Sequence, residues 1–433
     1  MKIFEQAQGV LLLAILFLLP WQTHLLVGVE PFLGAEGDAG LLRVYAVEGL
    51  VWLAFVLHPF VRVAERARLP VFLGWVVVLT LLVSTGFSSS ILLGFTTWLH
   101  IASAFLLFVL LVSETVPVRR AALVFVLGLV IPGVLGVFQA IMGSSPGASW
   151  LGLPARDAAL AGEAVIESFS LRWLRAAGAF PHPNIFGGYL AVALFACGFV
   201  FWQAKRFRVA LGAIGLLLFV TLLLTYSRSA WLALVLSAAI LCWILFTHHR
   251  SALRRVIPFG LAALLVIFFT VSIFSQPFAT RFDPTARLEG RSLEERVGGL
   301  ADWRSIMNQD PARWWRGVGL GHYPLTLTQI DPTRPLYALA PVHNTYLLIL
   351  AELGVPIALL LLLWIASMDR LNYAALPRIP AAVALAMGNV LLVVGFFDHY
   401  LWSSWSGLVL SAFVMAMTVR LSCHSELSSE GTQ

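Results

Sequence analysis

The feature that most constrains this chain is a series of long apolar runs that recur along its 433 residues. A helix needs about 20 apolar residues to cross roughly 30 Å of hydrocarbon, and about twelve runs approach or reach that length. They lie near residues 9–29, 43–61, 70–86, 91–113, 121–142, 184–203, 209–225, 229–247, 256–275, 343–366, 379–397 and 400–419. The sequence therefore predicts an all-α polytopic membrane protein, with residues 1–433 forming one integral membrane domain.

The short connections between these runs differ in charge on their two sides. Basic residues gather on one side, at 62–68, 119–120, 205–208, 248–255, 370, 378 and 420, whereas the opposite connections 86–90 and 396–400 contain no Lys or Arg. Because Lys and Arg accumulate in short cytoplasmic loops, both termini are predicted to be cytoplasmic, with residues 421–433 as a cytoplasmic tail. The predicted location is the inner membrane of a bacterium.

This orientation places two long segments, 143–183 and 276–342, on the outer, periplasmic face. The second is the large loop between spans nine and ten. Within it, Ser292–Glu295 has the pattern of a capping box that opens a helix. An apolar stripe follows at helical spacing, through Leu293, Val297, Leu300, Trp303 and Met307. We expect this helix to lie on the membrane surface or over the mouth of the bundle.

Three motif-like clusters share the predicted outer face: FPHPN at 180–184, TYSRSAW at 225–231 and PVHNTYLL at 341–348. The predicted inner face carries no comparable cluster. Residues far apart in the sequence thus converge at one mouth of the bundle, and we expect the functional site there.

Arginine is the first residue type at this mouth that points to chemistry. Arg228 lies in a turn too short to leave the interface, and its planar fork suits a phosphate or diphosphate. A snorkelling arginine is the structural alternative. Arg296, on the loop helix, and Arg175, just before the first cluster, are further candidates for substrate binding. For both, a solvated surface charge is the alternative.

Histidine is the second residue type at this mouth that points to chemistry. His343 begins a helix, where a cationic ring is disfavoured, and a neutral imidazole there can accept a proton from a hydroxyl near pH 7. A capping or interface histidine is the alternative interpretation. Asn344 either orients a ligand or caps the helix. Asp398 and His399 form either a second acid–base pair or a polar turn. The histidines lack the short spacing of metal ligands, so no metal and no cofactor are predicted.

Four segments also appear in an order that resembles a known family. AGAFPHPNIFGGYLA, TYSRSAWLALVL, RGVGLGHYP and VHNTYLLILAELGVP, between Arg175 and Pro356, are similar to motifs of O-antigen ligases and O-antigen polymerases. The resemblance implies a GT-C-like membrane fold and metal-independent transfer of a glycan from undecaprenyl diphosphate to an acceptor hydroxyl. It implies functional roles for Arg228, Arg296 and His343. Other arginines compete for the loop position, namely Arg281, Arg287, Arg291, Arg304 and Arg313.

The broken start of the sixth span fits this interpretation. Pro181 and Pro183 fix the entry of the chain, and such an irregular helix start is tolerated where it lines a cavity rather than lipid. His182 and Asn184 are then positioned to face sugar or phosphate. The adjacent glycines, Gly187 and Gly188, allow another backbone or a prenyl chain to approach closely.

The resulting hypothesis is an inverting glycosyltransferase of lipopolysaccharide or polysaccharide biosynthesis. Its expected partners are a carrier-linked glycan, an acceptor and membrane lipids. The preferred acceptor is lipid A–core, followed by a growing glycan on its carrier and then by protein. A transporter of lipid-linked sugars or small anions is the alternative from another class. With a net charge of +6 spread over loops at lipid headgroups, nucleic acid is not an expected partner.

Overall fold

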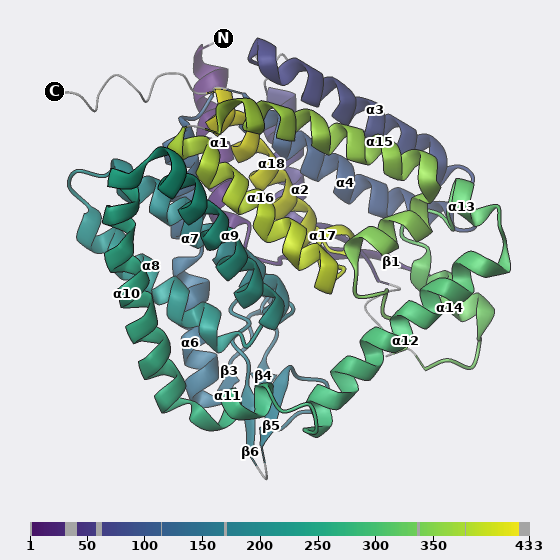
Figure 1. Ribbon diagram of the computed structural model, residues 1–433. Helices are drawn as coiled ribbons and strands as arrows, with labels where there is room; N and C mark the ends of the chain where they lie inside the picture. The colour runs from purple at the N-terminus through teal and green to yellow at the C-terminus, as the bar shows by residue number, and fades with distance from the viewer. Residues whose placement is uncertain are drawn as a thin grey trace.

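Helices dominate the computed structural model, which describes residues 2–30, 41–57, 63–113, 115–168, 171–335, 338–376 and 378–423. Among the described residues, nine helices are long and apolar enough to cross a membrane. Three shorter apolar helices, at Phe4–Leu18, Ala46–Leu57 and Arg208–Leu224, bring the number to twelve. The prediction of an all-α polytopic membrane protein is confirmed (Figure 1).

The described residues form these nine long and three shorter apolar helices in succession along the chain. In chain order they are α1 (Lys2–Leu18), α2 (Ala46–Leu57), α3 (Arg68–Thr85), α4 (Ile91–Val112), α5 with α6 (Val118–Gly128 and Val130–Met142), α7 (Pro183–Gln203), α8 (Arg208–Leu224), α9 (Arg228–His248), α10 (Arg250–Ile273), α15 (Thr345–Ala375), α16 (Ile379–Phe397) and α18 (Trp405–Cys423).

The first span is shorter than the sequence predicts. Helix α1 ends at Leu18, just before Pro20, because a proline disfavours helical geometry in the residue before it. The rest of the predicted run forms strand β1 (His24–Val29), which pairs antiparallel with β2 (Leu41–Tyr45). The prediction of one helix over 9–29 is therefore wrong in its second half.

The fifth span is divided by a break at Leu129. Pro132 lacks the N–H that would bond the carbonyl of Gly128, and its ring crowds that carbonyl, so α5 ends at Gly128 and α6 begins at Val130. The two pieces still form a single crossing from Val118 to Met142.

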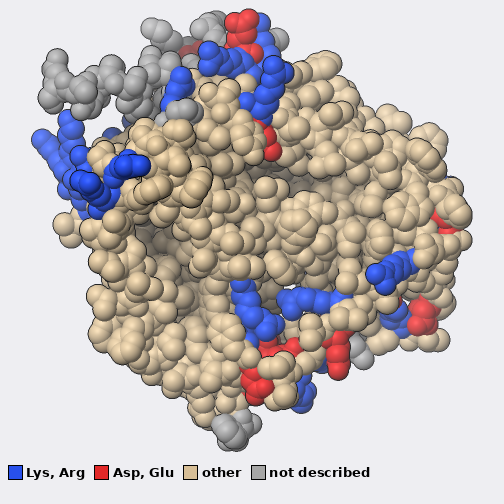
Figure 2. Space-filling model, in the orientation of Figure 1, with Lys and Arg blue, Asp and Glu red and all other residues tan. Residues whose placement is uncertain are grey.

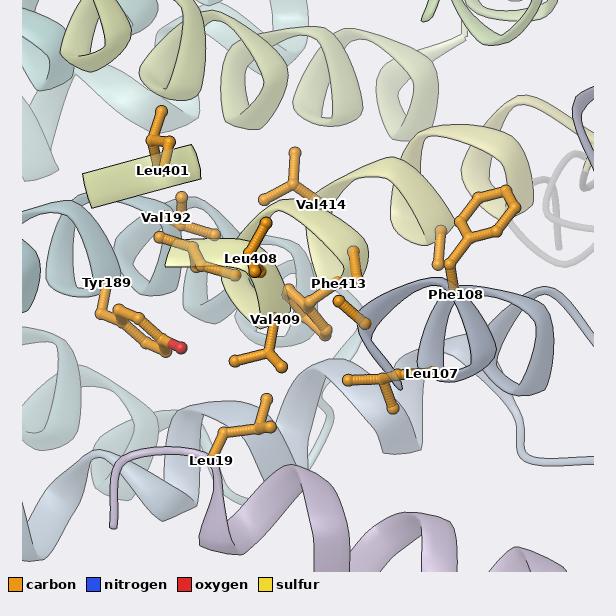
Figure 3. Close-up of a cluster of buried hydrophobic side chains, with 14 of the residues drawn as sticks. Leu19, Leu107, Phe108, Tyr189, Val192, Leu401, Leu408, Val409, Phe413 and Val414 are labelled. Atoms are coloured by element: carbon orange, nitrogen blue, oxygen red, sulfur yellow. The ribbon is translucent and has the colours of Figure 1, made fainter. Parts of the chain in front are cut away.

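Helix α18 lies at the centre of the bundle, where it packs against α4, α15 and α16. Figure 3 shows the core around it, in which Val409, Phe413 and Val414 meet side chains from α4 and α7. Phe413 stacks on Phe125 with the ring centroids 4.0 Å apart. This packed core fixes the helix ends that carry the polar motifs.

The bundle has two chemically different ends. The basic end holds the start of α1, the end of α18 and the arginine-rich connections 205–208 and 248–255. Figure 2 shows Lys and Arg side chains gathered there, and a second group beside α12 (Arg287–Gln309) at the opposite end. We call that opposite end, which carries His182, Arg228 and His343, the site end.

Both long segments lie at the site end. The first contains the short strands β3 (Ser144–Ser145), β4 (Arg156–Asp157), β5 (Val165–Ser168) and β6 (Leu171–Leu174). The second contains α11 (Ser275–Arg281), α12, α13 (Arg313–Arg316) and α14 (Tyr323–Ile330). In Figure 1, α12 extends along this end from α11 toward α14.

The orientation of the bundle in the membrane is a prediction that fusions can test. Because short basic loops stay in the cytoplasm, reporter fusions after Arg120, Arg208 and Arg255 should give a cytoplasmic signal. Fusions within 143–183 or 276–342 should give a periplasmic signal. A cytoplasmic signal from 276–342 would place the site end on the inner face and contradict the orientation.

Candidate active site

Helix α7 begins at the FPHPN motif with a side-chain cap. Nδ1 of His182 accepts a hydrogen bond from the backbone N of Asn184 at 3.1 Å, and Pro183 occupies the first helical position, which needs no N–H. Because Nδ1 accepts, the neutral ring carries its proton on Nε2. The side chain of His182 is exposed to solvent. Partial removal from water, and then Arg175, lower its pKa, so the ring presents an N–H donor at neutral pH.

The two glycines of this motif are explained by protein packing. A Cβ on Gly187 would lie 2.9 Å from Cβ of Ala230 on α9. A Cβ on Gly188 would collide with the hydroxyl of Tyr400, which begins α17 (Tyr400–Ser403). The close neighbours of both glycines are protein side chains, whereas the sequence had suggested another backbone or a prenyl chain.

A chain of hydrogen bonds joins the TYSRSAW and FPHPN motifs to Asp398. Arg175 is buried, and its Nε donates to the carbonyl of Thr225 at 2.8 Å. Its Nη2 donates to Oδ1 of Asn184 at 2.7 Å, and Nδ2 of Asn184 donates to Oδ2 of Asp398 at 2.8 Å. Both ends of the Asn184 amide are thus engaged, so this residue positions its neighbours.

Arg228 contacts a buried carboxylate that sequence reasoning missed. Glu289, 4% exposed, lies 3.2 Å from Nη2 of Arg228 and 2.6 Å, through Oε2, from Nη1 of Arg281. Arg281 also donates through Nε to the carbonyl of Tyr226 at 2.8 Å. These contacts between the arginine and glutamate side chains hold the TYSRSAW turn in place between α9 and α11.

Positive charge exceeds negative charge in this cluster. Burial, and then Arg281, lower the pKa of Arg175, although Glu289 acts in the opposite sense. Arg228 is the first residue of α9, where the helix dipole already favours an anion. We call Arg175, Arg228, Arg281 and Arg296 the arginine cluster. A polyvalent anion such as a diphosphate matches its excess charge.

Arg296 retains donor capacity. Its Nη1 donates to Oγ of Ser292 at 3.1 Å, and its Nε is buried without a hydrogen-bond partner among the described residues. The predicted capping box is wrong, because α12 begins at Arg287 and Ser292 lies inside the helix, where its hydroxyl accepts from Arg296. A buried, unpaired guanidinium N–H calls for an acceptor, which a bound ligand can supply.

The competing loop arginines differ in the residues that they contact. Arg281 joins the arginine cluster through Glu289, whereas the others do not: Arg287 pairs with Glu167, Arg291 with Glu295, Arg313 donates to the carbonyl of Ile306, and Arg304 is exposed. In the sequence, nothing in composition or spacing distinguishes Arg281 from these.

His343 lies beside Asp398 and His399. One side-chain N or O atom of each lies within 4.8 Å of the others, and the two imidazole centroids are 5.2 Å apart. The backbone N of His399 donates to Oδ1 of Asp398 at 2.9 Å, and Nδ1 of His399 lies 2.6 Å from Oγ of Ser403. We call these three residues the histidine cluster.

Two members of the histidine cluster, Asp398 and His399, have shifted pKa values. Burial lowers the pKa of His399 to about 4, so its ring is neutral. Burial acts to raise the pKa of Asp398. The opposing effects are larger, so this pKa stays below its usual value; they come from His399, His343, His182 and the hydrogen bond from Asn184. An ionised carboxylate beside His343 stabilises the imidazolium that forms when His343 accepts a proton.

Asn344 and Glu352 both have structural partners. Oδ1 of Asn344 caps α15 by accepting from the backbone N of Leu347 at 3.0 Å, and its Nδ2 donates to the carbonyl of Phe396 at 3.2 Å. The sequence analysis gave Asn344 two possible roles, orienting a ligand and capping the helix, and the structure contains the helix cap. Glu352 is buried and accepts from Nε1 of Trp402 at 2.8 Å, which ties α17 to α15.

The histidine cluster also contains donor types that bind transition metals. Both oxygens of Asp398 and Nδ1 of His399 are already used in hydrogen bonds within the protein. We retain the prediction of a metal-independent site. Purified protein treated with chelator should keep its activity, and elemental analysis should find no stoichiometric metal. Loss of activity that Zn²⁺ or Mn²⁺ restores would contradict this.

Comparison with known proteins gives a family for part of the chain. Residues 213–363 match the family described as O-antigen ligase. The matched segment runs from α8 into α15 and includes Arg228, Arg281, Glu289, Arg296 and His343. The curated proteins contain no significant match to this chain.

Proposed function

Since the chain belongs to the O-antigen ligase superfamily, we propose that it is a glycosyltransferase using undecaprenyl diphosphate as the glycan carrier. The transfer takes place at the site end, on the periplasmic face of the inner membrane, onto an acceptor hydroxyl. Family membership supports a lipid-linked glycan as substrate. The donor, the acceptor and the chemical steps are our proposal.

The observation that carries the proposal is the placement of the two clusters. The arginine cluster, whose charge suits a diphosphate, lies on one side, and the histidine cluster lies on the other. Arg175, Asn184 and Asp398 connect them through two hydrogen bonds of 2.7 and 2.8 Å. A glycosyl group held between the clusters has its leaving group and its proton acceptor on opposite sides, as an inverting displacement requires.

The reaction follows from this arrangement. His343 accepts the proton of the acceptor hydroxyl as its oxygen forms a bond to the anomeric carbon. The bond from that carbon to the diphosphate oxygen breaks, and undecaprenyl diphosphate leaves with the electron pair. The arginine cluster stabilises the charge that develops on the leaving group. Asp398 holds the imidazolium until the proton passes to water.

The acceptor has two principal candidates. The ligase resemblance implies lipid A–core, which we take as the first. A second carrier-linked glycan, the acceptor of a polymerase, is the next candidate, because the motifs also resemble those of O-antigen polymerases. Protein O-glycosylation is third. A transporter of lipid-linked sugars or small anions would form no new glycosidic bond.

Deletion of the gene tests the proposed function. We expect altered lipopolysaccharide or polysaccharide, together with altered lipid-linked glycan. Full-length glycan retained on the carrier indicates ligase activity, and single repeat units on the core indicate polymerase activity. Unchanged profiles of both pools would contradict the proposal. A plasmid copy of the wild-type gene should restore the original profile.

A further inference from the structure

Helix α15 is interrupted close to the site end. Gly354 has φ 70° and ψ 174°, which is outside helical geometry, and Pro356 follows two residues later. Because Pro356 has no N–H, the backbone carbonyl of Glu352 lacks the partner that a continuous helix would supply. Such a carbonyl within a membrane span is tolerated where other protein groups satisfy it, so we expect another segment to donate to it.

The donor belongs to residues 317–322, between α13 and α14, which we call the glycine loop. The backbone N of Gly319 donates to the carbonyl of Glu352 at 3.0 Å. The two backbones touch, because a Cβ on Gly317 would lie 2.1 Å from that carbonyl oxygen, and the φ of 66° at Gly317 also favours glycine. The motif RGVGLGHYP, which has no part in the transfer steps above, thus supplies the segment that completes α15.

The side chain of Glu352 binds two further segments. Its carboxyl group is buried and accepts hydrogen bonds from the backbone N–H groups of Gly321, in the glycine loop, and Tyr323, at the start of α14. It also accepts from Nε1 of Trp402 in α17 at 2.8 Å. One carboxyl group thus joins α15, the glycine loop and α17, and three N–H donors compensate its removal from water.

The glycine loop is itself fixed to the bundle through His322. Nε2 of this buried histidine accepts a hydrogen bond at 3.0 Å from the backbone N of Ser90, the residue that caps α4. Because Nε2 accepts, the proton of the neutral ring is on Nδ1, which donates to the carbonyl of Leu320 at 2.7 Å. The loop therefore presents its N–H groups to Glu352 from a fixed position.

Helix α17 connects this junction to the histidine cluster. The backbone N of Trp402 donates to the carbonyl of His399 at 3.0 Å, so α17 continues directly from the cluster. At the start of α15, Oγ1 of Thr345 donates to the backbone carbonyl of Asp398 at 2.8 Å. Helix α15 thus holds the segment 398–403 at two points, and the bond between Glu352 and Trp402 is the second of them.

The arginine cluster has separate supports. Helix α12 is held to α15 by Trp303, whose Nε1 donates to the carbonyl of Leu347 at 2.9 Å. The start of α12 is held by the ion pair of Glu289 with Arg281. A change at the carboxyl group of Glu352 should therefore move the histidine cluster and leave the proposed diphosphate site in place.

We propose that Glu352 is a positioning residue of the transfer reaction. Through Trp402 and α17 it holds Asp398 and His399 in place beside the proton acceptor. Through the glycine loop it ties this geometry to the long segment 276–342. Because Glu352 is buried, its effect reaches the reaction through the histidine cluster. The inference rests on the proposed function and adds a residue to it.

Replacement of Glu352 by glutamine is expected to lower kcat by about 10–100-fold, because a shift of about 1 Å in a catalytic group is enough for such a loss. The amide keeps the shape of the side chain, but its NH2 group cannot accept, so at least one of the three hydrogen bonds is lost. The donor KM should stay at the wild-type value. Trp402→Phe removes the donor from the other side of one of these bonds and should give the same result.

A double-mutant cycle separates positioning from a general loss of fold. If Glu352 acts through the histidine cluster, Glu352→Gln should lower the turnover of His343→Ala by at most about twofold, because losses from residues that act as a unit are not additive. A general loss of active protein would lower turnover equally in both backgrounds. The matched control is Glu48→Gln, which alters another buried carboxylate on α2 and should keep the wild-type kcat.

Hydrogen exchange measures the same contact without any turnover. The backbone amides of residues 402–404 should exchange faster in Glu352→Gln and Trp402→Phe than in the wild type and Glu48→Gln. Wild-type kcat in Glu352→Gln, an equal loss in both backgrounds, or unchanged exchange at 402–404 would each overturn the assignment and leave the proposed function intact. Wild-type turnover by His343→Ala would instead contradict the proposed base, and faster exchange in the two variants would still identify Glu352 as the residue that holds α17.

Discussion

Replacement of His343 by alanine is expected to lower turnover by about 10²–10⁴-fold, the usual contribution of a general base. The donor KM should change little, because the diphosphate contacts belong to the arginine cluster on the other side of Asp398. His343→Gln should be nearly as inactive, since an amide accepts a hydrogen bond but no proton at neutral pH. The measurement is turnover of a lipid-linked donor by purified protein in detergent or nanodiscs.

A matched histidine controls for general effects of the substitution. His248, exposed in the last turn of α9 at the basic end, can be replaced by alanine with no expected change in turnover. Near wild-type turnover by His343→Gln would show that His343 is not the base. Asp398 or His399 would then be the next candidate for proton transfer.

Replacement of Arg228 by alanine should reduce turnover by about 10²–10³-fold, comparable to the loss of one donor from a site that stabilises a developing anion. Arg228→Lys keeps the charge but loses the planar fork, so only part of the activity should remain. Both variants should express normally, because the side chain is 37% exposed and Arg281 still pairs with Glu289. Turnover and donor KM are measured together.

Arg287 provides the control for a change of charge in the same loop. It is 70% exposed and pairs with Glu167 away from the arginine cluster, so Arg287→Ala should retain wild-type turnover. Normal glycan produced by Arg228→Ala would show that Arg228 is a snorkelling or packing residue. The diphosphate would then have to be assigned to Arg175, Arg281 and Arg296 alone.

The sequence predicts the membrane architecture well because hydrocarbon imposes one requirement on every span. Twelve apolar runs match twelve apolar helices, even where the helix is short, as for α2. The failures lie where a local proline overrides the apolar pattern. Pro20 ends α1 before β1, and Pro132 divides α5 from α6. Hydropathy averages over such positions and does not detect them.

The site is only partly visible in the sequence. The motifs and the loop-charge pattern indicate which ends of helices meet, so Arg228, His343 and Asn184 are found from their position. Arg281 and Glu289 are not found from their position in the sequence, because their contact depends on how α11 and α12 fold back over α9. The capping pattern at Ser292 is also misleading, since the preceding residues Arg287–Arg291 continue the same helix.

The central claim is that this protein transfers a glycan from undecaprenyl diphosphate with His343 as the base. The most direct measurement is the reaction of purified protein with a defined carrier-linked glycan and an acceptor, followed by analysis of both products. We predict one equivalent of undecaprenyl diphosphate for each new glycosidic bond, with inverted anomeric configuration, and formation of both products about 10²–10⁴-fold slower in His343→Gln. Retained configuration, or product formation by His343→Gln at the wild-type rate, would contradict the mechanism. Movement of intact donor across the membrane with no new bond would identify a transporter instead.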